Sequence, residues 1–325
     1  MSHVLIAGGG GFIGGHLAAR LIAEGHSVRC VDLKPIDEWH QIHPDADNRA
    51  LDLSNLDSCR EAVKGTDRVF NLAADMGGMG FIELNKAACM LSSLIGTHLL
   101  LAARDSGTVS RFFFSSSACV YNAAKQTSPD VTALAESDAY PADPEDGYGW
   151  EKLFIERMCR HFEEDYGLET RVARYHNVYG PHGTWYGGRE KAPAALCRKV
   201  IEAKHQHRAS IQVWGDGEQS RSFMYIDDCV EGTLRLMDAP FNQPINIGSD
   251  ELVTINQMLT IIESIAGVEL DHVHDLSAPQ GVRGRNSDNT LIRDVLGWAP
   301  SIPLSEGLSR TYEWIESEYL LTASG

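Results

Sequence analysis

Basic residues are scarce in this chain. Among its 325 residues, 28 are Lys or Arg and 45 are Asp or Glu, which gives a formal net charge of −17 at pH 7. Such a surface would repel nucleic acids and anionic membranes, because their phosphates carry the same sign of charge. We therefore expect no nucleic-acid partner and no membrane partner. A small phosphate ligand would need locally clustered basic residues.

Several other features are missing. The sequence contains no apolar run that reads as a membrane span, and its start, MSHVLIAGGGGFIGGH, lacks the basic leader of a signal peptide. The seven cysteines are odd in number and irregularly spaced, with no CxxC pair and no Cys/His ladder. Free thiols are typical of a reducing compartment, and this spacing offers no metal-binding pattern. We expect a cytoplasmic protein without a metal site.

Strand-like and helix-like segments alternate along the first half of the chain. Strand patterns cover 3–8, 27–32, 67–73, 110–117 and the start of 169–180, and helix patterns cover 12–25, 86–104 and 148–166. This alternation predicts an α/β fold, a Rossmann-type doubly wound parallel sheet with helices on both faces. Beyond residue 180, loops rich in Gly, Arg and Pro interrupt the pattern. We predict a first domain at 1–180 and a smaller C-terminal substrate lobe at 181–325, interleaved and with a soft boundary.

The glycine-rich stretch GGGGFIG joins the first predicted strand to the first predicted helix. Glycines at this spacing allow a tight turn and let backbone amides approach a pyrophosphate at the helix N-terminus. Asp32 ends the next strand, where a carboxylate holds an adenosine ribose and repels a 2′-phosphate. We predict an NAD site, with a bare turn as the alternative. The predicted cofactor contacts are Gly8, Gly11, Phe12, Ile13, Gly14, Asp32, Asp52, Leu53 and Ala73; a helix N-cap and a core residue explain Asp52 and Leu53 nearly as well.

Tyr148 and Lys152, in the stretch YGWEK, lie four residues apart and so share one face of a predicted helix. A free phenol is too weak a base near neutral pH, but a nearby ammonium favours the phenolate. Such a tyrosine can remove a hydroxyl proton while hydride leaves the same carbon for NAD. The alternative is a surface pair, because the spacing is common.

The stretch SSSACVY raises the question of what a thiol does at the end of a buried strand. Ser117 and Cys119 are two residues apart, so on a strand both side chains would point the same way. A free cysteine also packs well as a small apolar residue. Considered alone, Cys119 fits packing better than chemistry.

Together, the glycine turn, SSSACVY and YGWEK resemble the extended short-chain dehydrogenase/reductase family, whose members act on nucleotide sugars. Longer segments, among them ADMGGMGF, YHNVYGP, GGREKAPAA, WGDG and GVRGRNSDN, are similar to the GDP-mannose 3,5-epimerases within it. The resemblance covers essentially the whole chain. It implies bound NAD, a GDP-hexose substrate, Ser117 and Tyr148 as the pair acting at C4 of the sugar, and Cys119 and Lys191 as the acid/base pair at C5 and C3.

The same resemblance, with the basic residues that stand out from the acidic background, implies a set of substrate contacts. Arginine suits a diphosphate because its planar guanidinium binds two oxygens at once. Arg285 is slightly preferred to Arg283 for this contact. The expected substrate-binding residues are Gly77, Ser117, Asn177, Glu190, Lys191, Lys199, Arg221, Arg283 and Arg285.

The sequence departs from the epimerase pattern in places. Asn122 stands where that pattern has Pro, and Gly147 stands where it has Ala, so the preferred nucleotide and hexose stay open. One alternative is another enzyme of the family, such as a nucleotide-sugar 4-epimerase, and another is an NAD-binding protein without activity. Apolar stripes on 86–104 and 148–166 correspond to the helices that relatives pair across a dimer interface, so we expect a homodimer.

Overall fold

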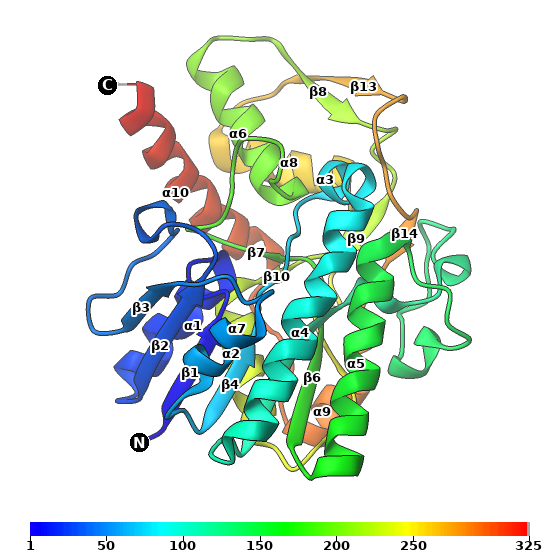
Figure 1. The fold of residues 1–325 in the computed structure, drawn as a ribbon. Coiled ribbons are helices and arrows are strands. Elements are labelled where there is room, and N and C mark those ends of the chain that lie inside the picture. The colour runs from blue at the N-terminus through cyan, green and yellow to red at the C-terminus, as the bar shows by residue number, and fades with distance from the viewer. Residues whose placement is uncertain (324–325) are drawn as a thin grey trace.

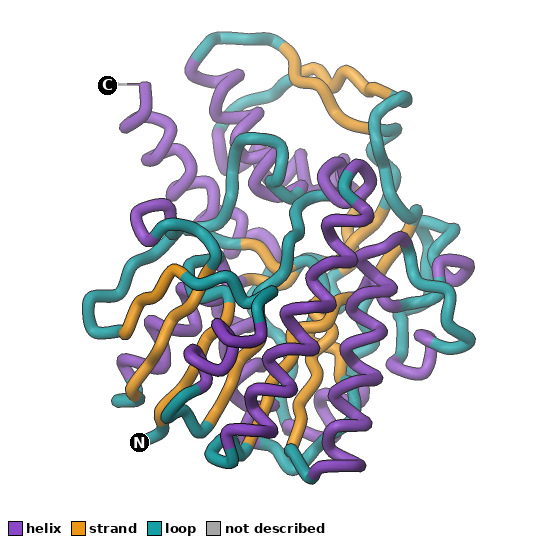
Figure 2. Tube along the Cα trace, in the orientation of Figure 1, coloured by secondary structure: helices purple, strands orange, loops and turns teal. Residues whose placement is uncertain are grey.

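The computed structural model describes residues 1–323 (Figures 1 and 2). Its central layer is a seven-stranded sheet with the order β11-β6-β5-β4-β1-β2-β3, and every neighbouring pair is parallel. The strands are β1 His3–Ala7, β2 Ser27–Asp32, β3 Asp47–Ala50, β4 Arg68–Asn71, β5 Arg111–Ser117, β6 Glu169–Tyr175 and β11 Ile245–Ile247. The predicted doubly wound parallel sheet is confirmed.

Helices cover both faces of this sheet because its strands are apolar on both sides. Along β1, Val4 and Ile6 join one buried cluster, whereas Leu5 and Ala7 join another on the opposite face. The flanking helices α1 and α7 pack together, as do α2, α4 and α5. Their bounds are α1 Phe12–Ala23, α2 Leu56–Val63, α4 Lys86–Ser106, α5 Asp146–Tyr166 and α7 Ile226–Asp238.

The C-terminal lobe lies beyond the carboxyl ends of the strands (Figure 1). Its helices are α6 Ala192–His205, α8 Ile255–Ala266 and α10 Leu304–Ala323. Its small sheets pair β8 Ser210–Trp214 with β13 Asp271–Asp275, β9 Ser220–Ser222 with β12 Leu252–Thr254 and β14 Gly284–Arg285, and β7 Val178–Tyr179 with β10 Met224–Tyr225. The remaining elements are α3 Met79–Leu84, α9 Thr290–Leu296 and the 3-10 turns η1 Ile36–Glu38, η2 Ala118–Val120, η3 Ala123–Lys125 and η4 Glu136–Ala139. Both α7 and β11 return to the main layer, so the two parts of the chain interleave.

By length and composition α4 could cross a membrane, although we expected no apolar run of that kind. Its apolar character has another physical reason. Leu99, Leu100, Ala102 and Ala103 are buried against the sheet, and Gly96 lets Ile155 of α5 approach closely. The helix packs against both α2 and α5, and a helix buried in this way is apolar around more of its surface.

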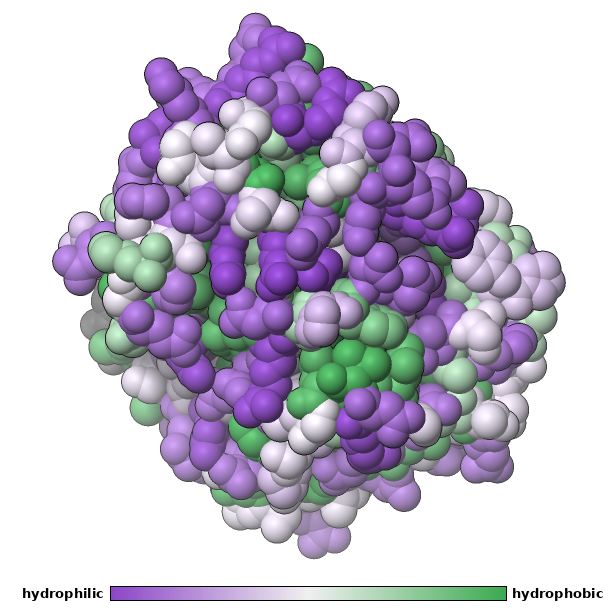
Figure 3. Space-filling view, turned by 90° about the horizontal axis from the view of Figure 1, so that it is seen from below, coloured by the Kyte–Doolittle hydropathy of each residue, from purple (hydrophilic) through white to green (hydrophobic). Residues whose placement is uncertain are grey.

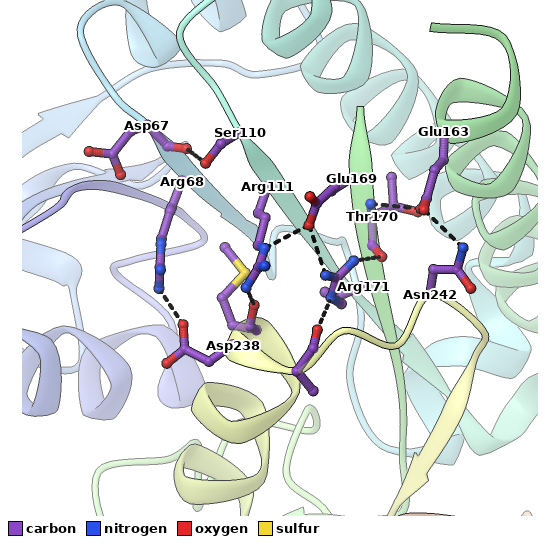
Figure 4. A network of polar contacts seen from close by, with 12 residues as sticks. Asp67, Arg68, Ser110, Arg111, Glu163, Glu169, Thr170, Arg171, Asp238 and Asn242 are labelled. Carbon is purple, nitrogen blue, oxygen red and sulfur yellow. Dashed lines mark hydrogen bonds and ion pairs between the residues drawn. The ribbon is translucent and has the colours of Figure 1, made fainter. Parts of the chain in front are cut away.

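The amino ends of the sheet strands carry a row of ion pairs (Figure 4). Arg111 at the start of β5 donates to Glu169 at the start of β6, and Arg68 at the start of β4 donates to Asp238 at the end of α7. Arg171 binds both Glu169 and the carbonyl of Ala239. This edge therefore holds α7 under the sheet. Figure 3, which looks onto this end of the molecule, shows a mostly hydrophilic face with a compact hydrophobic patch.

A deeper ion pair joins β6 to α5. Arg174 and Glu156 are 2% and 4% exposed, and two guanidinium nitrogens donate to the two carboxylate oxygens over 2.9 and 2.7 Å. Ser116 of β5 donates to the same carboxylate over 2.5 Å. A bidentate pair with this extra hydrogen bond offsets the desolvation of both charges.

Glu156→Gln should destabilise the fold by about 3–5 kcal/mol, because it leaves the Arg174 charge buried without a counter-ion. Equilibrium denaturation in urea checks this value. Glu164→Gln, which breaks the exposed pair with Arg160 on the same helix, is the matched control and should change stability little. Equal effects of the two substitutions would contradict the assigned role of the buried pair.

Candidate active site

A cavity of about 520 Å³ lies at the carboxyl edge of the sheet, between the sheet and the C-terminal lobe. The end of β5 and the first turns of α5 contribute to it from the main layer. Segments around residues 74–82, 188–199, 212–223 and 279–285 contribute from other parts of the chain. The predicted site residues that line it are Ile13, Gly77, Ser117, Cys119, Tyr148, Lys152, Asn177, Glu190, Lys191, Lys199, Arg221 and Arg285.

The glycine turn between β1 and α1 has the geometry that a dinucleotide site needs. Gly8 has a φ of +85°, and a Cβ on Gly14 would lie 2.1 Å from the Gly8 carbonyl oxygen. The turn therefore requires glycine at both positions, and it brings the start of α1 against the backbone. Asp32 ends the neighbouring strand β2. These residues fit a pyrophosphate at the helix N-terminus and a ribose at the strand end.

The other predicted cofactor contacts lie around this turn. Ala73 follows β4 and packs against Gly8, since a Cβ added to Gly8 would lie 2.9 Å from the Ala73 nitrogen. Phe12 packs beside Gly183. Leu53 is 4% exposed and belongs to the core under α2. Asp52 accepts a hydrogen bond from the Ser54 amide, and the helix N-cap is Asn55 instead. The cofactor roles of Asp52 and Leu53 stay predictions.

Tyr148 and Lys152 lie on α5 beside Ser117, and both are buried, at 7% and 2% exposure. The ammonium of Lys152 lies 5.5 Å from the centroid of the Tyr148 ring and 3.5 Å from a carboxylate oxygen of Glu151. We expected the ammonium to lower the pKa of the phenol. Without bound ligands, burial instead raises the pKa of Tyr148. Cys119 and Glu151 add to this rise, and a hydrogen bond with Ser117 opposes it.

Cys119 reaches the cavity by a different route from the one we expected. Strand β5 ends at Ser117, so the argument from alternating strand side chains is wrong; Cys119 lies in the 3-10 turn η2. Its amide donates to the Ser117 hydroxyl over 3.2 Å, which keeps the two residues together. It is partly exposed, whereas the six other cysteines are buried.

Lys191 faces the same cavity from the residue before α6. Burial lowers the pKa of Lys191, and the nearby Cys119 opposes that shift. Nη1 of Arg285 lies 3.4 Å from the Cys119 sulfur. A thiol, an amine and a guanidinium therefore meet beside the Ser117–Tyr148 pair.

The segment before Lys191 is fastened across the cavity. The Arg189 guanidinium pairs with Asp75 over 2.8 Å and lies 3.8 Å from the centroid of the Phe81 ring. The Gly78 amide donates to the Arg189 carbonyl over 3.0 Å. Glu190 pairs with Arg198 of α6 over 3.1 Å. These contacts hold the 188–191 segment over Gly77 and Gly78.

The four basic residues predicted for the diphosphate divide into two groups. Arg221 lines the cavity, is hydrogen-bonded to backbone carbonyls, and burial lowers its pKa to about 9, with Arg285 adding to the shift. Lys199 also lines the cavity and donates to the Gln212 carbonyl. Arg283 does not line it, because its guanidinium pairs with Asp216. The diphosphate contact of Arg283 stays a prediction.

Asn177 lines the cavity but donates its amide to the Ser222 carbonyl, with a φ of +40°. The sequence reasoning missed Glu145, Gln126 and Glu151, which surround the predicted residues. The position of Glu145 three residues before Tyr148 was the one available signal for it. Within the described residues 1–323, no three His, Cys, Asp or Glu side chains cluster as a metal site.

The model of the NAD dependent epimerase/dehydratase family matches residues 4–248. The chain belongs to this family. NAD is therefore its cofactor, in agreement with the glycine turn and Asp32.

Two groups of known proteins are similar to this chain. GDP-mannose 3,5-epimerase 1 of Oryza sativa subsp. japonica is 50% identical over 322 residues, which is 97% of this chain and 82% of that protein; GDP-mannose 3,5-epimerase of Arabidopsis thaliana is 48% identical over 316 residues, again 97% and 82%. The solved structure of UDP-glucose 4-epimerase from Thermotoga maritima with UDP-glucose has a TM-score of 0.87 at 27% identity, covering 98% of this chain and 99% of that chain. MoeE5 in complex with UDP-glucose and NAD has a TM-score of 0.80, also at 27% identity and with 98% and 99% coverage.

Asp32 should make the protein prefer NAD to NADP by at least about tenfold, which corresponds to roughly 1.4 kcal/mol of repulsion of a 2′-phosphate. Asp32→Asn should narrow this preference to about threefold or less, as dissociation constants from titration of nucleotide-free protein would measure. Asp37→Asn, an exposed change a few residues away, is the control. Equal affinities for both nucleotides in the unaltered protein would refute the assignment.

Proposed function

We propose that this chain is a GDP-mannose 3,5-epimerase, which converts GDP-mannose to GDP-L-galactose and can also form GDP-L-gulose. The main observation in support is that one cavity is lined by Cys119 and Lys191 together with Ser117, Tyr148 and Lys152. The relatives at about 50% identity, which span 97% of the chain, support the same activity.

The reaction begins and ends at C4 of the sugar. NAD, when bound, supplies a reversible hydride acceptor. Tyr148 takes the proton of the C4 hydroxyl, Ser117 holds that hydroxyl, and the positive charge of Lys152 favours the phenolate. The return of the proton from Tyr148 accompanies the final reduction, so no net redox change occurs.

Oxidation at C4 explains why a thiol and an amine are needed. A C4 ketone makes C3 and C5 α to a carbonyl, so each can lose a proton to form an enolate and regain one on the other face. Inversion requires proton-transfer groups on both sides of the ring. Cys119 comes from η2 and Lys191 from the segment before α6, which places the two groups on different elements around one cavity.

Substrate binding follows from the charge of the cavity. Arg221 has no carboxylate among its hydrogen-bond partners in the described residues, so its buried charge is available to a diphosphate. Lys199 and Arg285 add positive charge to the same lining. The guanosine and mannose parts of the proposal come from the names of the relatives.

Cys119→Ser should strongly slow proton exchange at carbon while sparing oxidation at C4, because a hydroxyl is a far weaker acid than a thiol. With GDP-mannose in deuterated water, NMR should show deuterium at C3 and C5 for the unaltered protein, and a loss of about 10²–10⁴ in its rate of incorporation for the variant. Transient reduced-nicotinamide absorbance should persist. Exchange at the unaltered rate would make Cys119 a packing residue. Epimerisation with unlabelled C3 and C5 in the unaltered protein would identify a 4-epimerase instead.

Assembly and location complete the proposal. Met90, Leu91 and Leu94 of α4 and Trp150 and Phe154 of α5 are each 42–63% exposed, and the two helices pack side by side. A second copy of this helix pair would cover these side chains in a four-helix interface.

Seven free cysteines support a reducing, cytoplasmic location.

The protein should be a dimer in light scattering at micromolar concentration. Leu91→Asp should shift it to monomer, because the new charge would be buried against the partner. Leu33→Asp changes another exposed leucine, which lies outside these helices, and should leave the dimer intact. A monomeric mass for the unaltered protein would overturn this part of the proposal.

A further inference from the structure

The guanidinium of Arg285 is held from two sides beside the Cys119 thiol. Its Nε donates to the Gln126 side-chain oxygen over 2.6 Å, and its Nη2 donates to the Glu145 carboxylate over 2.9 Å. The remaining terminal nitrogen, Nη1, lies 3.4 Å from the Cys119 sulfur. The side chains of Arg285 and Glu145 are 5% and 17% exposed, so solvent screens this contact little.

Glu145 occupies a position that connects this contact to the rest of the site. It is the N-cap residue of α5, but its side chain makes no cap hydrogen bond and turns to Arg285 instead. Its carbonyl accepts a hydrogen bond from the Gly149 amide, and a Cβ on Gly149 would lie 2.3 Å from the Cys119 carbonyl oxygen. The start of α5 and the turn η2 are therefore in close contact, with Glu145 at their junction.

The charges around the sulfur come from several elements. Arg285 of β14, Arg221 of β9, Lys191 before α6 and the phenol of Tyr148 all interact electrostatically with Cys119. A guanidinium group beside a sulfur stabilises negative charge on it. The carboxylate that pairs with Arg285 is Glu145. Glu145 also interacts electrostatically with Arg221 and with Glu83 of α3.

We propose that Glu145 is a positioning residue for proton transfer at Cys119: it holds Arg285 on the sulfur and offsets part of the guanidinium charge. This inference rests on the proposed function. In the proposed reaction, Cys119 must accept a proton from carbon in one step and donate a proton to carbon in another. A sulfur that is held too firmly as the thiolate would serve as a base but would fail as an acid. Glu145 provides the balance, and Arg285 keeps a contact with the reacting group in both states.

The charge part of the proposal can be tested without any substrate. The rate of iodoacetamide labelling of Cys119, followed by peptide mass spectrometry against pH, reports the thiolate; Cys119→Ser supplies the background from the six buried cysteines. Glu145→Gln keeps an acceptor oxygen but removes the negative charge, so its profile should move about one pH unit lower. The matched control is Asp146→Asn, which removes the next carboxylate along, one that pairs with Lys86. A Glu145→Gln profile that superimposes on that of the unaltered protein, or an equal shift in Asp146→Asn, would overturn the proposal.

The positioning part of the proposal is tested by comparing Glu145→Gln, which keeps an acceptor for Arg285, with Glu145→Ala, which removes it. Crystal structures should show Nη1 of Arg285 still on the sulfur in the Gln variant and displaced from it in the Ala variant. Deuterium incorporation from deuterated water should fall by less than about fivefold in the Gln variant and by about 10–100-fold in the Ala variant, with KM changed less than kcat. An Ala variant with Arg285 in place, or with the exchange rate of the Gln variant, would refute the positioning role. Absence of exchange in the unaltered protein would count against the proposed function, while the labelling profiles and structures would still decide the role of Glu145.

Discussion

The ion pair between Arg174 and Glu156 sets the register on which the site depends. Both charges are buried, and an unpaired buried charge is costly, so arrangements of β6 and α5 that separate the two side chains are disfavoured. Tyr148, Lys152 and Glu156 follow one another at intervals of four residues, which places them along one stripe of α5. Ser116 brings β5 into the same network, one residue before Ser117. The residues that we propose to act at C4 are thus aligned by a contact outside the proposed chemistry.

The same network extends to the last strand of the sheet. Asn246 of β11 accepts hydrogen bonds from Tyr121 and from the ring of His176, and its backbone amide donates to Glu136. Burial lowers the pKa of His176 to about 3, so this ring stays neutral and adds no charge beside Arg174. A strand from the second half of the chain therefore completes the polar core under the first, which is the physical reason that the chain interleaves.

Local sequence patterns predicted five of the seven strands of the main layer but missed the two outermost strands, β3 and β11. Short apolar segments predicted β1, β2 and β5, apolar stripes predicted the two long helices, and the glycine turn predicted how α1 begins. The side-chain partners came from distant segments and had no local signal. Arg283 and Arg285 look alike in the sequence, yet Asp216 takes one away from the cavity and Glu145 fixes the other inside it. The position of Cys119 was reached for the wrong reason, because the strand ends two residues earlier than the argument required.

The cavity is enclosed by two kinds of contact that differ in strength. Its floor is made of buried, charge-paired and hydrogen-bonded groups on α5 and the sheet, whereas the 188–191 segment above it is fastened by Arg189 and Asp75, which are 50% and 44% exposed. An exposed ion pair contributes about 1 kcal/mol or less, far below the free energy needed to disturb the floor. The segment is also held by the hydrogen bond from the Gly78 amide and by the less exposed pair of Glu190 with Arg198, and it leads into Lys191 at the start of α6. The groups on α5 and the sheet are thus shielded from solvent, whereas the segment that carries Lys191 is attached in part through solvent-exposed side chains.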